Sequence, residues 1–178
     1  MFVYLIILFF TKGISVFPVY KIILAEKIDN IYLNSIEVFN MFINSKGIGI
    51  KFDNNSEYNI MPMKLLETIK YFYMEHYNNF YYFQTLYKDE YTQLIVSDYC
   101  DSFEILHFFL EDKGIMIPIE KLFTLNKENN KFTFIFLGKE DEDNIIFGKE
   151  LMRLMNLKFA NNNIIIDNKS FLIDDERF

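Results

Sequence analysis

The stretch Ile145-Ile146-Phe147-Gly148 is a short apolar run that ends in glycine, and it decides the fold that we expect for this chain. A β-branched and aromatic run of this length, bounded by polar residues and glycine, predicts a buried strand. The next residues, Lys149 to Met155, bring Leu151, Met152, Leu154 and Met155 together at helical spacing. The stretch therefore predicts a strand that passes through a glycine directly into a short helix.

A second stretch, about ninety residues earlier, is also an apolar run that is followed by a predicted helix. The apolar residues Ile50 and Phe52 lead into Asp53, which is followed by Asn54-Asn55-Ser56 and then by the step Ile60-Met61-Pro62. Proline favours the first turn of a helix. The apolar positions beyond it recur at three- and four-residue spacing, which predicts an amphipathic helix; they are Leu65, Leu66, Ile69, Phe72 and Tyr73.

The rest of the chain is typical of a mainly β domain. It has 178 residues, of which 51% are hydrophobic and 19% aromatic, enough for one ordinary domain with a packed core. Short apolar runs between polar turns predict strands, at Ile14–Leu24, Ile28–Phe39, Ile48–Phe52, Tyr91–Val96, Phe103–Leu110, Ile115–Ile117, Phe132–Leu137, Asn144–Phe147, Leu157–Phe159 and Ile164–Ile166. Many strands with two short helices indicate the mainly β class.

In this order, the features resemble the C-terminal lobe of a pepsin-like aspartic protease. That family's catalytic loop reads apolar-apolar-Asp-Thr/Ser-Gly-Thr/Ser before an apolar-Pro step, and a later apolar-apolar-Gly strand crosses the loop in a psi-shaped core. The resemblance implies a closed or partly open β-barrel lobe over residues 14–178. It also implies that Asp53 is the catalytic aspartate, that the Ser56 hydroxyl braces the loop, and that Gly148 packs in the psi-shaped core.

The catalytic loop departs from the family pattern in two residues. Asn54-Asn55 replaces the Thr/Ser-Gly pair, and glycine suits a tight turn because it tolerates left-handed backbone angles. Asparagine tolerates such angles better than other side chains, so we expect the loop to form, with its side chain close to the position of the lytic water. The alternative interpretation of Asp53 is a surface turn residue.

The family's chemistry needs two carboxylates that share one proton, one from each lobe. The sequence contains no second copy of the Asp53 stretch, so we expect no peptide cleavage by this lobe alone. A second lobe or a homodimer could supply the partner carboxylate for a peptide or protein substrate. The alternative is a non-enzymatic binding or scaffold module that retains the fold.

Charge and composition argue against several other classes of function. A net charge of −7 opposes nucleic-acid binding, which depends on clustered Lys and Arg. Cys100 is the only cysteine, and neither His76 nor His107 has a partner at metal-ligand spacing, so we expect no metal or cofactor and interpret both histidines as packed or surface residues. The acidic residues 140–143 are interpreted as a solvated turn.

The N-terminal apolar run, Phe2 to Phe10, is too short to cross a bilayer as a helix, so we expect no transmembrane anchor. Residues 1–13 are either a signal peptide or a first strand. The first alternative would send the protein into the secretory pathway or out of the cell.

Overall fold

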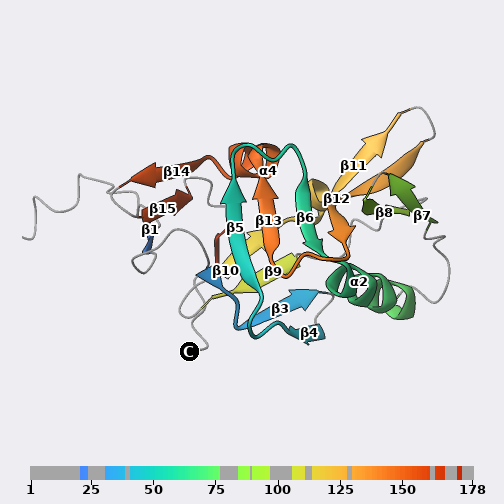
Figure 1. The fold of residues 1–178 in the computed structure, drawn as a ribbon, viewed down its shortest axis with the longest axis horizontal. Helices are drawn as coiled ribbons and strands as arrows, with labels where there is room; N and C mark the ends of the chain where they lie inside the picture. Colours follow the sequence, from blue (N-terminus) through green and yellow to red (C-terminus); the bar gives the residue numbers. More distant parts are fainter. Residues whose placement is uncertain are drawn as a thin grey trace, which may run out of the picture.

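The computed structural model describes residues 21–23, 31–38, 41–76, 84–88, 90–96, 106–110, 114–127, 130–160, 163–166 and 172–173. Within these residues the chain is mainly β, with strands in three sheets and a few helices (Figure 1). The prediction of a mainly β class is confirmed. Residues 1–13 and Cys100 lie outside the described part of the chain.

The largest sheet has eight strands and contains both stretches that the sequence singles out. Its strands are β2 (Ile31–Tyr32), β5 (Gly49–Asp53), β13 (Ile145–Gly148), β6 (Asn59–Pro62), β12 (Lys131–Lys139), β8 (Tyr91–Val96) and β7 (Gln84–Lys88) in that order, with β11 (Phe123–Asn126) paired to β12. Strand β13 lies between β5 and β6, parallel to β5 and antiparallel to β6 (Figure 1). Among the described strands this sheet ends at β2 and β7, so it does not close into a barrel.

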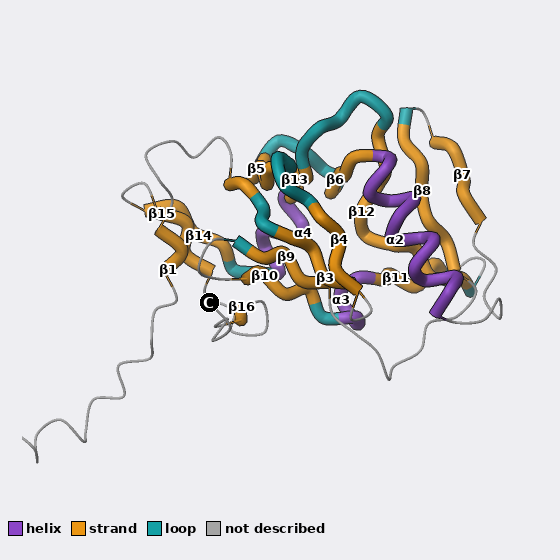
Figure 2. Tube along the Cα trace, turned by 90° about the horizontal axis from the view of Figure 1, so that it is seen from below, coloured by secondary structure: helices purple, strands orange, loops and turns teal. Residues whose placement is uncertain are grey.

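Two smaller antiparallel sheets complete the described structure. The five-stranded sheet has the order β16 (Leu172–Ile173), β10 (Gly114–Ile117), β9 (Leu106–Phe109), β3 (Ser35–Val38) and β4 (Met41–Asn44). The three-stranded sheet has the order β1 (Lys21–Ile23), β15 (Asn163–Ile166) and β14 (Leu157–Ala160), and it extends to one side of the other two sheets (Figure 2).

Aromatic rings join the five-stranded and eight-stranded sheets. Phe108 of β9 meets Phe147 of β13 and Phe136 of β12, with ring centroids 5.5 and 6.2 Å apart, and all three side chains are fully buried. Phe136 and Phe147 also meet each other at 5.8 Å. Buried aromatic side chains contribute large apolar areas and favour tilted ring contacts of this kind, so the three rings form the centre of the core.

The helices cover the eight-stranded sheet at different places. Helix α2 (Met63–His76) packs on β12 (Figure 2), and α3 (Ile119–Leu122) precedes β11. Helix α4 (Lys149–Leu154) follows β13 without a break. The two helices expected from the sequence are therefore present, and α3 is a further short one. A Cβ on Gly138 would lie 2.7 Å from Leu66 Cδ2, so this glycine allows α2 to approach β12.

One predicted strand is divided between two sheets. Residues 28–39 were expected to form a single strand, but β2 belongs to the eight-stranded sheet and β3 to the five-stranded sheet. The chain crosses at Leu33, whose N–H donates to Ile48 O, and at Asn34, whose N–H donates to Phe109 O. The first bond goes to the residue before β5 of the eight-stranded sheet and the second to β9 of the five-stranded sheet. A run of apolar residues carries no sign of that change of partner.

A buried asparagine at the start of β6 joins three strands. Asn59 Oδ1 accepts a hydrogen bond from the Gly148 N–H at 2.9 Å, and its Nδ2 donates to Ile135 O at 3.2 Å. Asn59 is only 7% exposed. Buried backbone groups must be hydrogen-bonded, and here one side chain satisfies a donor of β13 and an acceptor of β12.

We predict that Asn59→Ala lowers the free energy of unfolding by about 3 kcal/mol, because it leaves two backbone groups without this partner. Urea unfolding measures the loss. Asn34→Ala is the matched control, since its exposed side chain donates a single bond to Leu110 O at 3.0 Å and should cost about 1 kcal/mol. Equal losses for the two variants would contradict a special role for Asn59.

Candidate functional site

The structure brings the three candidate residues of the sequence together. Asp53 is the last residue of β5 and Gly148 the last residue of β13, and the two lie opposite each other in the parallel register. Ser56 lies in the loop that connects β5 to β6, next to Gly148. The expected proximity of the Asp53 loop and the strand Ile145 to Phe147 is therefore observed.

Hydrogen bonds close the Asp53 loop on itself. Asp53 Oδ1 accepts the Asn55 N–H at 2.8 Å, and Asp53 O accepts the Ser56 N–H at 3.2 Å. An aspartate that bonds the backbone two residues ahead is a common way to form a tight turn. The Asp53 side chain is half-buried, and Asn54 and Asn55 are exposed.

The expectation that this loop uses left-handed backbone angles is wrong. Among the described residues, the non-glycine positions with positive φ are Asn130 and Asn156. Asn54 and Asn55 are not among them, because the turn is closed by the Asp53 carboxylate and by the Ser56 N–H. Their replacement of the family's glycine therefore does not strain the backbone here.

Ser56 braces the loop through both its side chain and its backbone. Its hydroxyl donates to Tyr58 O at 2.7 Å, within the same loop. Its carbonyl oxygen accepts the Lys149 N–H at 3.0 Å, which ties the loop to the first residue of α4. The hydroxyl thus fixes the path of residues 56–58, and the carbonyl fixes the loop to the helix.

Gly148 fits under this loop because it has no side chain. A Cβ at this position would clash with Tyr58 O and would lie 3.0 Å from Ser56 O. Its φ of −77° is accessible to any residue, so the restriction is one of space. The backbone carbonyls of the loop therefore occupy the space that a side chain at position 148 would need.

An exposed ion pair crosses from the loop to the helix. Lys149 Nζ lies 2.6 Å from Glu57 Oε1. The hydrogen bond from Lys149 and its positive charge both hold the pKa of Glu57 below its usual range, against a small opposing effect of desolvation. Both side chains are more than half exposed, so salt weakens the pair.

Asp53 has no carboxyl partner in the described part of the chain. Its side-chain hydrogen bond goes to the Asn55 N–H, and none of the ion pairs among the described residues includes it. A pair of carboxylates that shares a proton needs the two groups in direct contact. The site as described therefore holds one acidic group of the two that such a mechanism requires.

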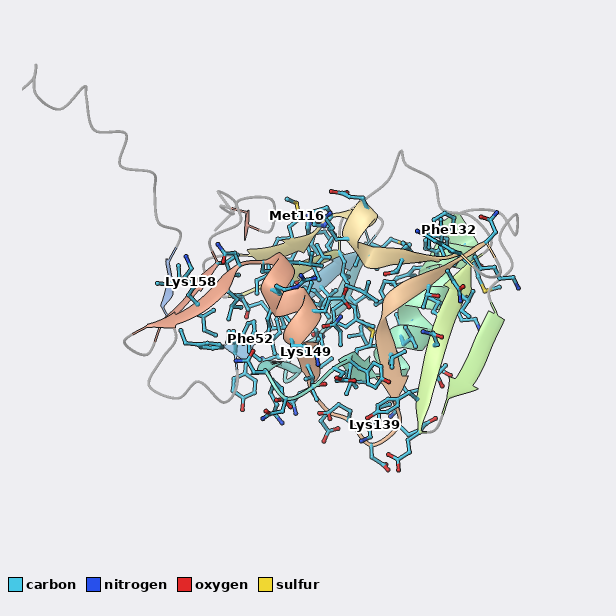
Figure 3. The ribbon with its side chains drawn as sticks, turned by 90° about the horizontal axis from the view of Figure 1, so that it is seen from above. Phe52, Met116, Phe132, Lys139, Lys149 and Lys158 are labelled. Carbon is cyan, nitrogen blue, oxygen red and sulfur yellow. The ribbon has the colours of Figure 1, made fainter. Side chains whose placement is uncertain are left out.

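Aromatic side chains surround the loop, and some of them face solvent. Phe52 packs against Phe147 with ring centroids 5.4 Å apart and lies 6.4 Å from Phe159 (Figure 3 labels Phe52 and Lys149). Tyr58 is 44% exposed and Phe159 41%. The elements next to the loop thus expose apolar rings of a kind that interfaces often use.

The other candidates from the sequence lie elsewhere. His107 Nδ1 is 3.0 Å from Glu37 Oε2 on the neighbouring strand, which agrees with a packed histidine; the side chain of His76 is outside the described part. Of residues 140–143, all but the half-buried Glu142 are exposed, in the turn between β12 and β13, as expected for a solvated turn. No group of three potential metal ligands occurs among the described residues.

No helix in the described part of the chain is both long and apolar enough to cross a membrane. No protein-family model matches the chain, and no curated protein matches it either.

Sequence reasoning missed Asn59, Glu57 and Lys149, which fix the loop in place. Asn59 gave a usable signal, a single amide at the head of the apolar residues Ile60 and Met61. Glu57 and Lys149 gave none, because their contact joins positions 92 residues apart.

We predict that Gly148→Ala destabilises the protein by about 3 kcal/mol, because the added methyl group meets backbone carbonyls that cannot move aside. Thermal and urea unfolding measure the effect. Gly138→Ala is the control and should cost about 1 kcal/mol, since its methyl group meets the movable ends of Leu66 and Met63. A Gly148→Ala protein as stable as the wild type would show that β13 does not pack under the loop.

We predict that Glu57 titrates at higher pH in Lys149→Met than in the wild type, because the substitution removes the hydrogen bond and charge that lower its pKa. A lowered folded-state pKa means that the pair stabilises the protein above the unfolded-state pKa of Glu57. That contribution disappears as the pH falls through the lower, folded-state pKa. NMR titration measures the midpoint of Glu57 in the wild type and in Lys149→Met. Lys139→Met is the control, because Lys139 lies 3.8 Å from Glu90 and not beside Glu57. A Glu57 midpoint that does not move in Lys149→Met contradicts the assignment.

Proposed function

We propose that this chain is a single lobe of the pepsin-like aspartic protease type, with Asp53 at the position of the family's catalytic aspartate. The observation that carries the proposal is the placement of β13 between β5 and β6, which sets Gly148 opposite Asp53. The resemblance of the sequence to that family implies this crossing of an apolar-apolar-Gly strand with an aspartate loop. The carbonyl oxygens of Ser56 and Tyr58, which leave no room for a side chain at Gly148, support the same assignment.

Alone, the lobe does not hydrolyse peptides in this proposal. Hydrolysis by this chemistry needs one carboxylate to accept a proton from water while a second, protonated one donates to the scissile carbonyl. Asp53 supplies one such group, and it contacts no second carboxyl among the described residues. A single carboxylate cannot hold both protonation states at the same moment.

A second lobe or a second copy of the chain would supply the missing group. The exposed rings of Tyr58 and Phe159 beside the loop support such a partner, because exposed apolar side chains are often covered in an assembly. In a symmetric pair each Asp53 would meet its own symmetry mate. The substrate would then be an extended peptide between the two lobes.

The second candidate function is a non-enzymatic binding module. It is favoured by the closure of the loop on itself, since the Ser56 hydroxyl and the Asp53 carboxylate both bond atoms of their own loop. A fold often persists after its site has changed. The two candidates differ in whether a partner carboxylate restores hydrolysis.

We predict that the purified chain does not cleave an acid-pH peptide substrate, and that Asn54→Thr with Asn55→Gly does not restore cleavage in a monomer. The double variant restores the family's loop sequence but adds no second carboxylate. Cleavage is measured with a quenched fluorescent peptide, and sedimentation at each protein concentration gives the oligomeric state. If the double variant forms a symmetric dimer, cleavage should appear in proportion to the dimer.

Asp53→Asn in the same double variant is the control, because it removes the general base and keeps nearly the same shape. If the unmodified chain cleaves the peptide and Asp53→Asn abolishes that cleavage, the proposed inactivity is wrong and the role of Asp53 stands. Cleavage that persists in Asp53→Asn would contradict the role of Asp53 itself.

A further inference from the structure

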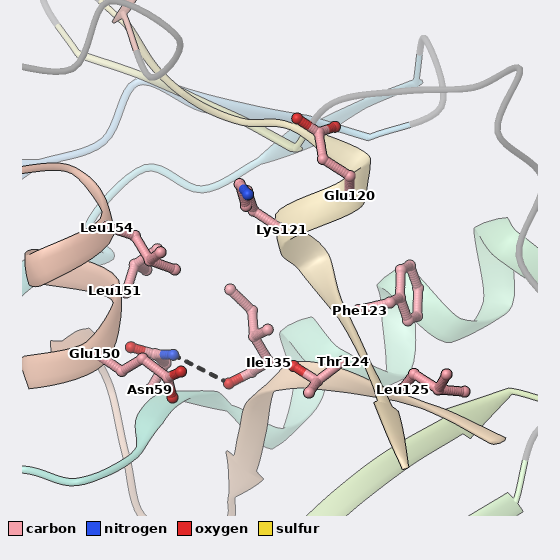
Figure 4. Close-up of a pocket in the computed structure, with 10 residues that line it drawn as sticks. All are labelled: Asn59, Glu120, Lys121, Phe123, Thr124, Leu125, Ile135, Glu150, Leu151 and Leu154. Atoms are coloured by element: carbon pink, nitrogen blue, oxygen red, sulfur yellow. Dashed lines mark hydrogen bonds between the residues drawn. The ribbon is translucent and has the colours of Figure 1, made fainter. Parts of the chain in front are cut away.

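A cavity of about 280 Å³ lies between helix α4, strand β11 and the middle of β12. Figure 4 shows Leu151 and Leu154 of α4 on one side of it, residues of β11 on the other, and Ile135 between them. Concave, mainly apolar sites with a few polar groups are typical of bound small molecules, and their volumes begin at about 300 Å³. The cavity therefore has room for a small molecule with a single ring.

The cavity lies where β12 changes its partner strand. Phe134 pairs with Phe123 of β11. Two residues later, Phe136 pairs with Asn59 of β6. Ile135 lies at the junction, and its carbonyl oxygen accepts a hydrogen bond from Asn59 Nδ2 (Figure 4). Both Ile135 and Asn59 line the cavity, so its walls combine an apolar side chain with a polar one.

The apolar walls of the cavity can hold a hydrocarbon ring. Leu151 is fully buried, Ile135 is half-buried and Leu125 is 42% exposed, so the apolar lining extends from the core to the surface. A ring that covers Leu125 removes apolar surface from water, which favours binding.

The buried amide of Asn59 has hydrogen-bonding capacity beyond its bonds to the protein. An asparagine amide offers two N–H donors and an oxygen that accepts two hydrogen bonds. The bonds to Ile135 O and from the Gly148 N–H use one donor and one acceptor position. Asn59 is more than nine-tenths buried and lines the cavity, so the second N–H and the second acceptor position are left for a molecule bound there. A carboxamide matches both, because it accepts through its oxygen and donates through its nitrogen.

The elements around the cavity carry charges of both signs, so they do not select an ion. The charged side chains of α3, of α4 and of the residue after β11 are all exposed; they are Glu120, Glu150, Lys121, Lys127, Lys149 and Arg153. Exposed charges are solvated and screened by salt. The buried polar side chain of the lining is the neutral Asn59. The cavity therefore favours a neutral molecule.

We propose that this cavity binds a small, neutral carboxamide that carries an apolar ring. The ring lies against Leu151 and Ile135 and covers Leu125, and the amide group exchanges hydrogen bonds with Asn59. The apolar contacts supply affinity, and the pairing with a buried amide supplies selectivity. The inference does not depend on Asp53 or on the proposed protease lobe.

The test titrates the full chain with benzamide and follows the backbone amide resonances by heteronuclear NMR. We expect saturable binding with a Kd of about 1 mM, as for an efficient ligand of this size. Acetophenone has nearly the same shape but carries a methyl group in place of the amide nitrogen, and benzoate accepts hydrogen bonds but is charged. Each should bind about tenfold more weakly than benzamide. No saturable binding of benzamide at about 10 mM, or equal binding of the three compounds, would overturn the proposal.

A variant at the cavity locates the bound probe. Thr124→Trp places a large ring at the cavity from an exposed position, and it should weaken benzamide binding by about tenfold or more because the ring fills the space. Glu67→Trp is the control, since it adds the same ring to the exposed face of α2 and should leave the affinity unchanged. Equal affinities of these two variants for benzamide would place the probe elsewhere and overturn the site.

Asn59→Ala tests the partner of the amide group. In this variant benzamide and acetophenone should bind equally well, because the preference for benzamide comes from the pairing with Asn59. A preference that persists in folded Asn59→Ala would overturn this role of Asn59. Circular dichroism of each variant establishes that the fold is retained. If Asn59→Ala fails to fold, the three compounds and the Thr124→Trp comparison remain decisive.

Discussion

The described fold depends on one constraint, that strand β13 occupies the place between β5 and β6. Strands β5 and β6 follow each other in the chain, so a simple hairpin between them would satisfy their backbone groups locally. Instead, β13 separates them, although its Gly148 lies 89 residues after Asn59 in the chain. The Gly148 N–H donates its hydrogen bond to the side chain of Asn59. The Asp53 loop has to span the end of the inserted strand, and only a residue without a side chain fits at position 148.

The same insertion organises the hydrophobic core. Phe147 is the residue before Gly148, and it contacts Phe136 in its own sheet and Phe108 in the five-stranded sheet. Core packing and loop geometry are therefore set by adjacent residues of a single strand. Since protein interiors are densely packed and transmit small shifts, a change in the packing of Phe147 would also move the backbone beneath Asp53.

Helix α4 connects two regions with different chemistry. Its first residue, Lys149, binds the loop through the backbone and through Glu57, whereas Leu151 and Leu154 line the cavity beside β11. The loop holds a single carboxylate whose neighbours are its own backbone groups, and hydrolysis there requires a second acid from outside.

Local sequence patterns determined most of the strands and both longer helices, because side-chain periodicity acts over a few positions. Asp53, Ser56 and Gly148 were singled out by the resemblance to a protease family. Local patterns did not determine that residues 31–38 change sheets at Leu33, that the loop turns without left-handed angles, or that β12 exchanges β11 for β6 at Ile135. Each of these features is a choice of hydrogen-bond partner, and the partners lie tens of residues away in the chain. Only the tertiary structure decides such pairings, because a backbone N–H or C=O is chemically the same in every residue and its partner is selected by packing.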